Sequence, residues 1–115
     1  MKTKSIMLAV VVMLFSISTI FASDVKTEKI KVYGNCGMCK TRIEKAANSV
    51  KSVTSASWNS DDAMLTVTFD AAKTTTLKIE EAVSKVGHDT DHTKAADKTY
   101  SGLPGCCQYD RPAKK

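Results

Sequence analysis

Two cysteines, Cys36 and Cys39, stand where the spacing of apolar residues changes from that of a strand to that of a helix. Before them, Ile30 and Val32 alternate with charged and polar residues, as in a strand with one buried face. After them, apolar residues recur every three or four positions, as on one face of a helix: Ile43, Ala46, Ala47 and Val50. The stretch 33–42, YGNCGMCKTR, is therefore predicted to turn from a strand into a helix.

The next part of the chain is predicted to form a hairpin and a second helix. Residues 53–70 alternate in character on both sides of a turn cluster at 59–62, which is typical of a β-hairpin. The alternating positions are Thr54, Ala56 and Trp58 in the first arm and Leu65, Val67 and Phe69 in the second. A helix then follows a capping threonine, Thr75 or Thr76, and ends at Gly87. Its apolar stripe is made of Ile79, Ala82, Val83 and Val86.

This order of elements predicts an α+β fold, a ferredoxin-like split β-α-β sandwich that a fourth strand would complete. The fourth strand is weak or irregular, because residues 89–98 offer almost nothing to bury. A short edge strand at 92–95 and an irregular segment both remain open. The cysteine-containing tail at 96–115 is expected to pack back on the domain through its apolar anchors, which are Tyr100, Leu103, Pro104 and Tyr109.

The first 22 residues have the pattern of a secretory signal peptide, with two lysines, an apolar run at 6–21 and a cleavage point after Ala22. The run is shorter than the roughly 20 apolar residues of a membrane-spanning helix, so we expect cleavage and no membrane attachment afterwards. The 93 residues that remain of the 115 suit one small domain at 23–95 followed by the tail. The mature protein is expected in the periplasm or outside the cell.

Charge and composition argue against two classes of function. The net charge of +5 falls to +3 when the two lysines of the signal peptide leave, and the other lysines are scattered among acidic residues. Without a basic stripe or interleaved aromatic residues, we expect no nucleic-acid binding. Asp61 and Asp62 are interpreted as turn residues, and no serine stands in a nucleophile setting, so we expect no enzyme.

The pair Cys36 and Cys39 has the chemistry of a site for soft metal ions. Two thiolates at a strand-to-helix turn can converge on one cation, and the helix N-terminus lowers the thiol pKa. Gly34 and Gly37 give the loop freedom to wrap around an ion. Sulfur ligands favour copper(I) first, with mercury(II) and zinc(II) behind it.

With these residues in place, the chain resembles the heavy-metal-associated domain family, which includes copper chaperones and the periplasmic mercury-binding protein. The matching motifs are the strand KIKVYG, the C-x-x-C pair, CKTRIEKA, the hairpin SASWNSDDAMLTVTFD and the helix end VSKVGH, over roughly residues 25–93. The resemblance implies a ferredoxin-like fold with Cys36 and Cys39 as the metal ligands.

Two positions depart from the family pattern. The methionine that the family places two residues before the first cysteine, where it anchors the loop in the core, is Gly34 here. Met38, between the two cysteines, is interpreted as a core plug or a cover of the loop rather than as a ligand. After Gly87 the chain has His88, which is a candidate third ligand, with an exposed loop histidine as the alternative. His92, in a polar stretch, is expected to face solvent.

Cys106 and Cys107 lie outside the usual family domain, and adjacent cysteines rarely pair with each other because such a ring is strained. Three interpretations remain open. The pair adds thiolates to the site of Cys36 and Cys39, forms disulfides with it, or serves a partner.

The resulting functional hypothesis is an exported, soluble carrier or scavenger of a thiophilic ion that passes the ion on by thiolate exchange. Its expected partners are the metal ion and a membrane metal transporter or another metal-accepting protein. Two alternatives are kept: a thiol–disulfide redox protein and a disulfide-stapled module without metal. The first lacks a proline that would face the dithiol, because Pro104 and Pro112 both lie in the tail.

Overall fold

The computed structural model describes residues 24–112. The predicted signal peptide at 1–22 lies outside the described residues. None of the described helices is long and apolar enough to cross a membrane.

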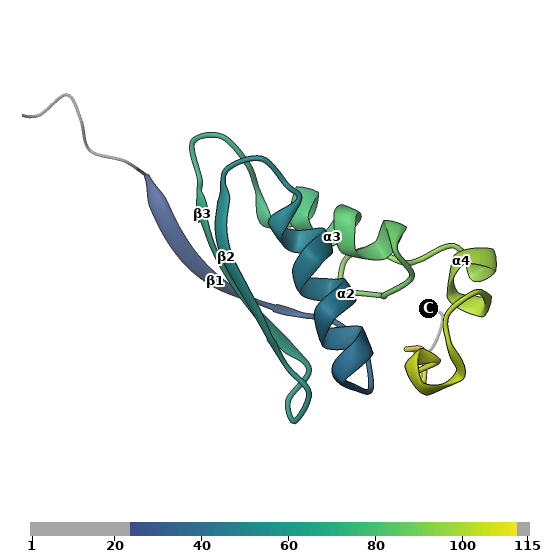
Figure 1. The fold of residues 1–115 in the computed structure, drawn as a ribbon. Helices are drawn as coiled ribbons and strands as arrows, with labels where there is room; N and C mark the ends of the chain where they lie inside the picture. Colours follow the sequence, from purple (N-terminus) through teal and green to yellow (C-terminus); the bar gives the residue numbers. More distant parts are fainter. Residues whose placement is uncertain (1–23, 113–115) are drawn as a thin grey trace, which may run out of the picture.

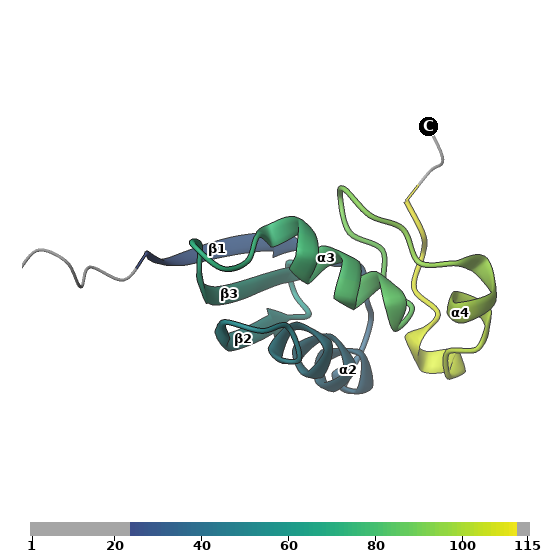
Figure 2. The same cartoon turned by 90° about the horizontal axis from the view of Figure 1, so that it is seen from above.

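A sheet of three strands carries two helices on one face (Figures 1 and 2). The strands are β1 (Val25–Lys31), β2 (Val53–Asn59) and β3 (Met64–Asp70), in the spatial order β1-β3-β2, and both pairs are antiparallel. The helices are α2 (Gly37–Asn48) and α3 (Thr76–Lys85). The predicted α+β fold and the order of its elements are confirmed.

The core lies between the sheet and the two helices. Alternation along β3 buries Leu65, Val67 and Phe69, as predicted. Along β2 only Trp58 is fully buried. Of the other two positions predicted to alternate with it, Ala56 is half-buried and Thr54, at the bulge between Val53 and Ser55, is exposed. The helices contribute apolar residues at the spacing expected from the sequence: Ile43, Ala46, Ala47, Ile79 and Val83.

Helix α3 begins and ends where the sequence indicates. The hydroxyl of Thr75 accepts a hydrogen bond from the backbone N–H of Lys78 at 3.3 Å, which satisfies one unpaired donor of the first turn. Gly87 has a φ of 113°, a left-handed conformation that favours glycine and stops the helix.

The predicted fourth strand is reduced to one bridge between Val32 and Thr90. Residues 92–95 are not a strand, so the irregular alternative is the correct one. The reason lies in local hydrogen bonds, since the N–H of Thr90 bonds to the carbonyl of Thr93 at 2.9 Å and the carboxylate of Asp89 accepts from the N–H of Ala95 at 2.8 Å. These bonds turn the chain away from the sheet edge.

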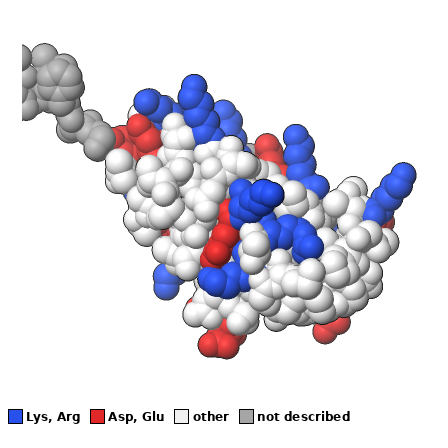
Figure 3. Space-filling model, in the orientation of Figure 1, with Lys and Arg blue, Asp and Glu red and all other residues white. Residues whose placement is uncertain are grey.

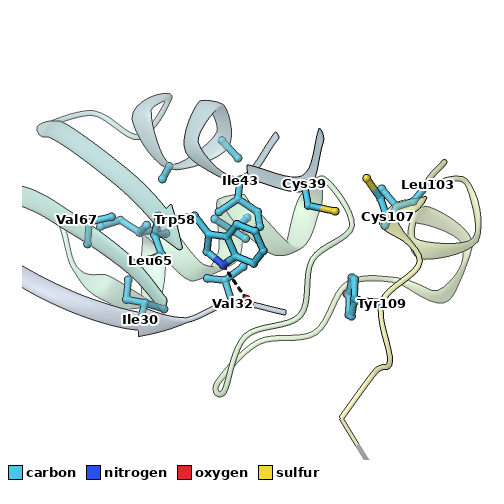
Figure 4. Packing of buried hydrophobic residues seen from close by; sticks show 14 of the residues in the cluster. Ile30, Val32, Cys39, Ile43, Trp58, Leu65, Val67, Leu103, Cys107 and Tyr109 are labelled. Atoms are coloured by element: carbon cyan, nitrogen blue, oxygen red, sulfur yellow. Dashed lines mark hydrogen bonds between the residues drawn. The ribbon is translucent and has the colours of Figure 1, made fainter. Parts of the chain in front are cut away.

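The tail folds back against the N-terminal end of α2, as both ribbon views show (Figures 1 and 2). It contains the short helix α4 (Asp97–Ser101) and a single turn of 3₁₀ helix, η1 (Gly105–Cys107). Leu103, Cys107 and Tyr109 are buried and belong to the same apolar cluster as the sheet and helices (Figure 4). The tail thereby brings the second cysteine pair to the first.

Charges of both signs are spread over the face drawn in Figure 3. Lysine and arginine side chains lie among aspartates and glutamates on that face, with broad uncharged areas between them. The view agrees with the scattered charges of the sequence.

Candidate metal centre

The centre begins at the first turn of α2. Cys36 is the residue before the helix, with extended backbone angles, and its carbonyl accepts the first helical hydrogen bond from Lys40 at 3.0 Å. Cys39 lies one turn further and is fully buried, whereas Cys36 is half-buried. The change from strand to helix thus places both sulfurs at the same helix end, 3.7 Å apart.

Trp58 forms the floor of the loop. Its indole N–H donates to the carbonyl of Val32 at 3.0 Å, and the ring is 1% exposed (Figure 4). A Cβ on Gly34 would lie 3.1 Å from the Trp58 ring and 3.2 Å from the Cβ of Cys39, closer than ordinary packing allows. Trp58 therefore occupies the space in which a larger side chain at Gly34 would anchor the loop.

Met38 is not a core plug, which corrects one of the two interpretations of this residue. Its side chain is 53% exposed, because it points outward from the first turn of α2. Its sulfur lies 3.6 Å from the Sγ of Cys106. Met38 therefore covers the outer side of the cysteine loop and touches the tail.

The four cysteine sulfurs form one group, and all four are free thiols. The Sγ of Cys36 is central, at 3.7 Å from that of Cys39 and 3.6 Å from that of Cys107. Cys106 and Cys107 have their sulfurs 3.9 Å apart, and the sulfurs of Cys36, Cys106 and Cys107 all lie within 4.8 Å of one another. Figure 4 shows the sulfurs of Cys39 and Cys107 pointing toward one another across the gap between helix and tail.

The spacing of these sulfurs suits more than two ligands. With metal–sulfur bonds of about 2.3 Å, two sulfurs on opposite sides of an ion lie about 4.6 Å apart, three in a plane about 4.0 Å, and four in a tetrahedron about 3.8 Å. The separations of 3.6 and 3.7 Å around Cys36 are near the last two values. The separation of 3.7 Å between the sulfurs of Cys36 and Cys39 is shorter than the two-coordinate value, and the sulfur of Cys107 lies at a similar distance from that of Cys36.

The thiols of Cys36 and Cys39 differ in acidity. The hydrogen bond from the backbone N–H of Cys39 is the main cause that lowers the pKa of Cys36, and together with the neighbouring thiols of Cys106 and Cys107 it brings that pKa to about 6 against the effect of burial. Burial raises the pKa of Cys39 to about 11, since its sulfur is removed from water. At neutral pH, Cys36 is therefore mostly a thiolate, the form of cysteine that binds soft ions, whereas Cys39 keeps its proton.

His88 is fully buried, so the exposed-loop alternative is wrong. Its Nδ1–H donates to the carbonyl of Tyr33 at 2.8 Å, and its ring stacks on that of Tyr109 with centroids 5.4 Å apart. Nε2 then carries the free lone pair, and it is buried without a hydrogen-bond partner. Burial lowers the pKa of the ring. His88 is not one of the clustered groups around Cys36.

His92 lies away from the cysteine loop, on the side of α3. Its side chain is 73% exposed, as expected, and its Nδ1 contacts the buried carboxylate of Glu80 at 2.9 Å. The contact raises the pKa of His92.

Sequence reasoning named Tyr109 and Leu103 as apolar anchors of the tail but missed the hydrogen bonds and the ion pair that hold it in place. The hydroxyl of Tyr109 donates to the carbonyl of Gly87 at 2.8 Å and accepts from the N–H of Asp89 at 2.7 Å. Arg111 forms a two-point ion pair with the buried Asp89 carboxylate, at 2.8 and 2.9 Å. A Cβ on Gly87 would lie 2.9 Å from Leu103, so the glycine also admits the tail. The only signals in the sequence were one tyrosine, one arginine and one aspartate without a helical or strand pattern.

Known proteins resemble this chain in both sequence and fold. The model of the heavy-metal-associated domain family matches residues 35–89. The copper chaperone CopZ of Staphylococcus aureus is 33% identical over 55 residues, which are 48% of this chain and 81% of that protein.

Two solved structures add to this likeness. The water-soluble region of the P-type ATPase CopA from Bacillus subtilis is 32% identical with a TM-score of 0.56, over 61% of this chain and 47% of that one. Oxidized MerP from Ralstonia metallidurans CH34 is 25% identical with a TM-score of 0.50, over 57% of this chain and 96% of that one. The family match spans Cys36, Cys39 and His88 and ends before the second cysteine pair.

Proposed function

The chain belongs to the heavy-metal-associated domain family and has a heavy-metal-binding domain like that of copper chaperones, and from this premise we propose that it carries one soft metal ion between Cys36 and Cys39. The observation that supports this best is the position of Cys36. It lies at a helix N-terminus with its pKa lowered to about 6, and three further thiols surround it. The clustered thiols give a soft ion several sulfur ligands in one place.

Cys107 is the third ligand in this proposal. Its sulfur lies 3.6 Å from Cys36 and is fully buried at the end of the 3₁₀ helix. A buried thiol has little hydration to lose when it binds an ion, so coordination by Cys107 beside the other thiols is favourable. His88 acts as a positioning residue, because its hydrogen bond to the Tyr33 carbonyl fixes the chain immediately before the loop.

Copper(I) is the proposed cargo, with mercury(II) and zinc(II) as the ions to test against it. Three sulfurs suit the low coordination numbers of copper(I), and four sulfurs suit zinc(II). The similarity to CopZ and CopA supports copper, and the similarity to MerP gives the reason to include mercury.

The proposed action is transfer by ligand exchange in the periplasm or outside the cell, following signal-peptide cleavage. A thiolate of the acceptor adds to the ion before a cysteine of this chain leaves, so the ion is never released to water. The acceptor is a membrane metal transporter or another metal-accepting protein, and the likeness to a P-type ATPase domain supports the first. No covalent bond of an organic substrate is made or broken.

The test is a metal titration of reduced residues 23–115 in the absence of oxygen, with copper(I), mercury(II) and zinc(II) in competition. Native mass spectrometry counts the ions, and alkylation followed by peptide mapping shows which cysteines are protected. We expect tight binding of copper(I) with protection of Cys36, Cys39 and Cys107. Replacement of Cys36 or Cys39 by serine should abolish tight binding, and Cys107→Ser should weaken it.

The same experiment separates the alternatives. A thiol–disulfide redox protein or a stapled module would be isolated with stable disulfides and, once reduced, would bind none of the three ions tightly. That result would overturn the carrier function.

A further inference from the structure

We propose that Met38 and Cys106 form a second, solvent-facing sulfur site for copper(I) beside the inner site of Cys36, Cys39 and Cys107. The inference rests on the proposed function, because it assigns a further part of the same sulfur cluster. The name outer site is used here for Met38, Cys106 and the one thiolate, of Cys107 or Cys36, that they share with the inner site.

The outer site rests first on a contact between distant parts of the chain. Met38 comes from the first turn of α2 and Cys106 from the 3₁₀ helix of the tail, yet their sulfurs lie 3.6 Å apart. Both residues are exposed, and Met38 keeps 53% of its surface open although it is apolar. An exposed methionine placed sulfur-to-sulfur against an exposed thiol gains little from burial, but it forms half of a ligand set.

The inner site supplies the remaining ligand. The Sγ of Cys107 lies 3.9 Å from that of Cys106, and the Sγ of Cys36 lies within 4.8 Å of both. One thiolate can therefore bridge an ion in the inner site and an ion in the outer site. Around an ion with bonds of about 2.3 Å, neighbouring sulfurs in a plane of three lie about 4.0 Å apart. The sulfur of Cys106 lies near this distance from both of its neighbours, at 3.6 Å from that of Met38 and 3.9 Å from that of Cys107.

The ligand types decide which ion the outer site selects. A neutral thioether is a soft ligand that suits copper(I) and offers little to zinc(II), which prefers thiolate, imidazole and carboxylate. The outer site should therefore add a second copper(I) without adding a second zinc(II).

The exposure of the outer site suggests its role in passing the ion to a partner protein. Cys39 and Cys107 are fully buried, so an ion held by them is shielded from a partner. Met38 and Cys106 stand in solvent at the edge of the same cluster. An ion can move from the buried sulfurs to the exposed pair by one exchange of a ligand, and the partner then meets it at the surface.

The decisive experiment uses residues 23–115, which contain only two methionines, Met38 and Met64. Native mass spectrometry counts the copper(I) ions, while the carbon-13 signals of the two methionine methyl groups are followed through the titration. We expect two copper(I) ions and one zinc(II) ion. The Met38 methyl signal should shift with the second equivalent of copper(I), and the Met64 signal should stay in place.

Variants tie the second ion to the outer site. M38L and C106S should each lose the second copper(I) and retain the first with Cys36, Cys39 and Cys107 protected. M64L is the matched control, since Met64 lies in β3, and it should bind as the unchanged protein does.

The outcomes distinguish this proposal from the function beneath it. If the protein binds one copper(I) at the inner cysteines and the Met38 signal does not move, the outer site is wrong and the carrier function stands. If M38L and C106S both bind two ions, the outer site is equally wrong. If no copper(I) binds at all, the carrier function itself fails.

Discussion

The two cysteines of the loop differ in protonation state at neutral pH. Cys36 stands at the helix end with its pKa lowered to about 6 from the ordinary 9.0, chiefly by the backbone N–H of Cys39. Cys39 is buried and its pKa is raised to about 11. At neutral pH the sulfur of Cys36 is therefore mostly a thiolate, while the buried sulfur of Cys39 stays protonated.

This difference in pKa predicts how the alkylation of each cysteine depends on pH in the metal-free, reduced protein. Iodoacetamide should modify Cys36 with a midpoint near pH 6, as the fraction of thiolate rises, and should leave Cys39 unmodified up to pH 8. Peptide mapping after brief exposure to the reagent measures both rates. A midpoint for Cys36 near the ordinary 9.0 would contradict the proposed environment.

The same shift has a consequence for folding. A folded-state pKa below the unfolded value contributes stability that is fully present above pH 9.0 and is lost as pH falls through about 6. Acidification between these values should therefore lower the free energy of unfolding of the metal-free protein.

Gly34 gives a prediction about packing beneath the loop. Gly34→Ala should lower the free energy of unfolding by about 1–3 kcal/mol, because the new methyl group presses on the buried ring of Trp58. The ring cannot yield easily, since its N–H is bonded to the Val32 carbonyl. Urea denaturation measures the change, and Gly37→Ala is the control, because a Cβ there meets nothing within 4 Å. Equal stability of the two variants would refute the close packing of Gly34 against the Trp58 ring.

Among the elements, the tail depends most on a few polar contacts. It buries Leu103, Cys107 and Tyr109, but the direction of the chain after them is fixed by the ion pair of Arg111 with Asp89. Burial by itself raises the pKa of Asp89, yet the bonds from Arg111 and the Ala95 N–H outweigh it and leave the pKa below the ordinary 3.8. The contribution of this pair to stability is therefore present above pH 3.8 and is lost as pH falls below it.

Arg111→Leu should lower the free energy of unfolding by about 3 kcal/mol, because the Asp89 carboxylate stays buried without its partner. Cys107 should become accessible to alkylating reagents as the tail loosens. Denaturation and thiol mapping measure the two effects. Asp97→Asn is the control, since Asp97 is the exposed partner of Arg111 and its loss should change stability by less than about 1 kcal/mol. A loss no larger than that of the control would show that the tail is held by its apolar residues alone.

Over the whole molecule, the sequence predicted those features that depend on residues close together in the chain. The spacing of apolar residues placed the strands and helices of the sandwich, and the C-x-x-C pair was expected at the helix end where it lies. The approach of Cys107 to Cys36 joins positions 71 residues apart and depends on Tyr109, Asp89 and Arg111 together, so no periodic pattern could reveal it. His88 was similarly ambiguous, because its burial comes from the ring of Tyr109 in the tail.

The single bridge at Thr90 decides how far the tail can reach. A full strand continuing from that bridge would run antiparallel to β1, past its seven residues, and at about 3.3 Å per residue would end more than about 20 Å from the cysteine loop. The eleven residues from Asp97 to Cys107 would then have to cover that distance, at roughly 2 Å per residue, before Cys107 could reach the loop. Because the fourth strand is absent from the described fold, the chain between Thr90 and Cys107 has a shorter distance to cover. This shorter path allows the sulfur of Cys107 to lie beside that of Cys36.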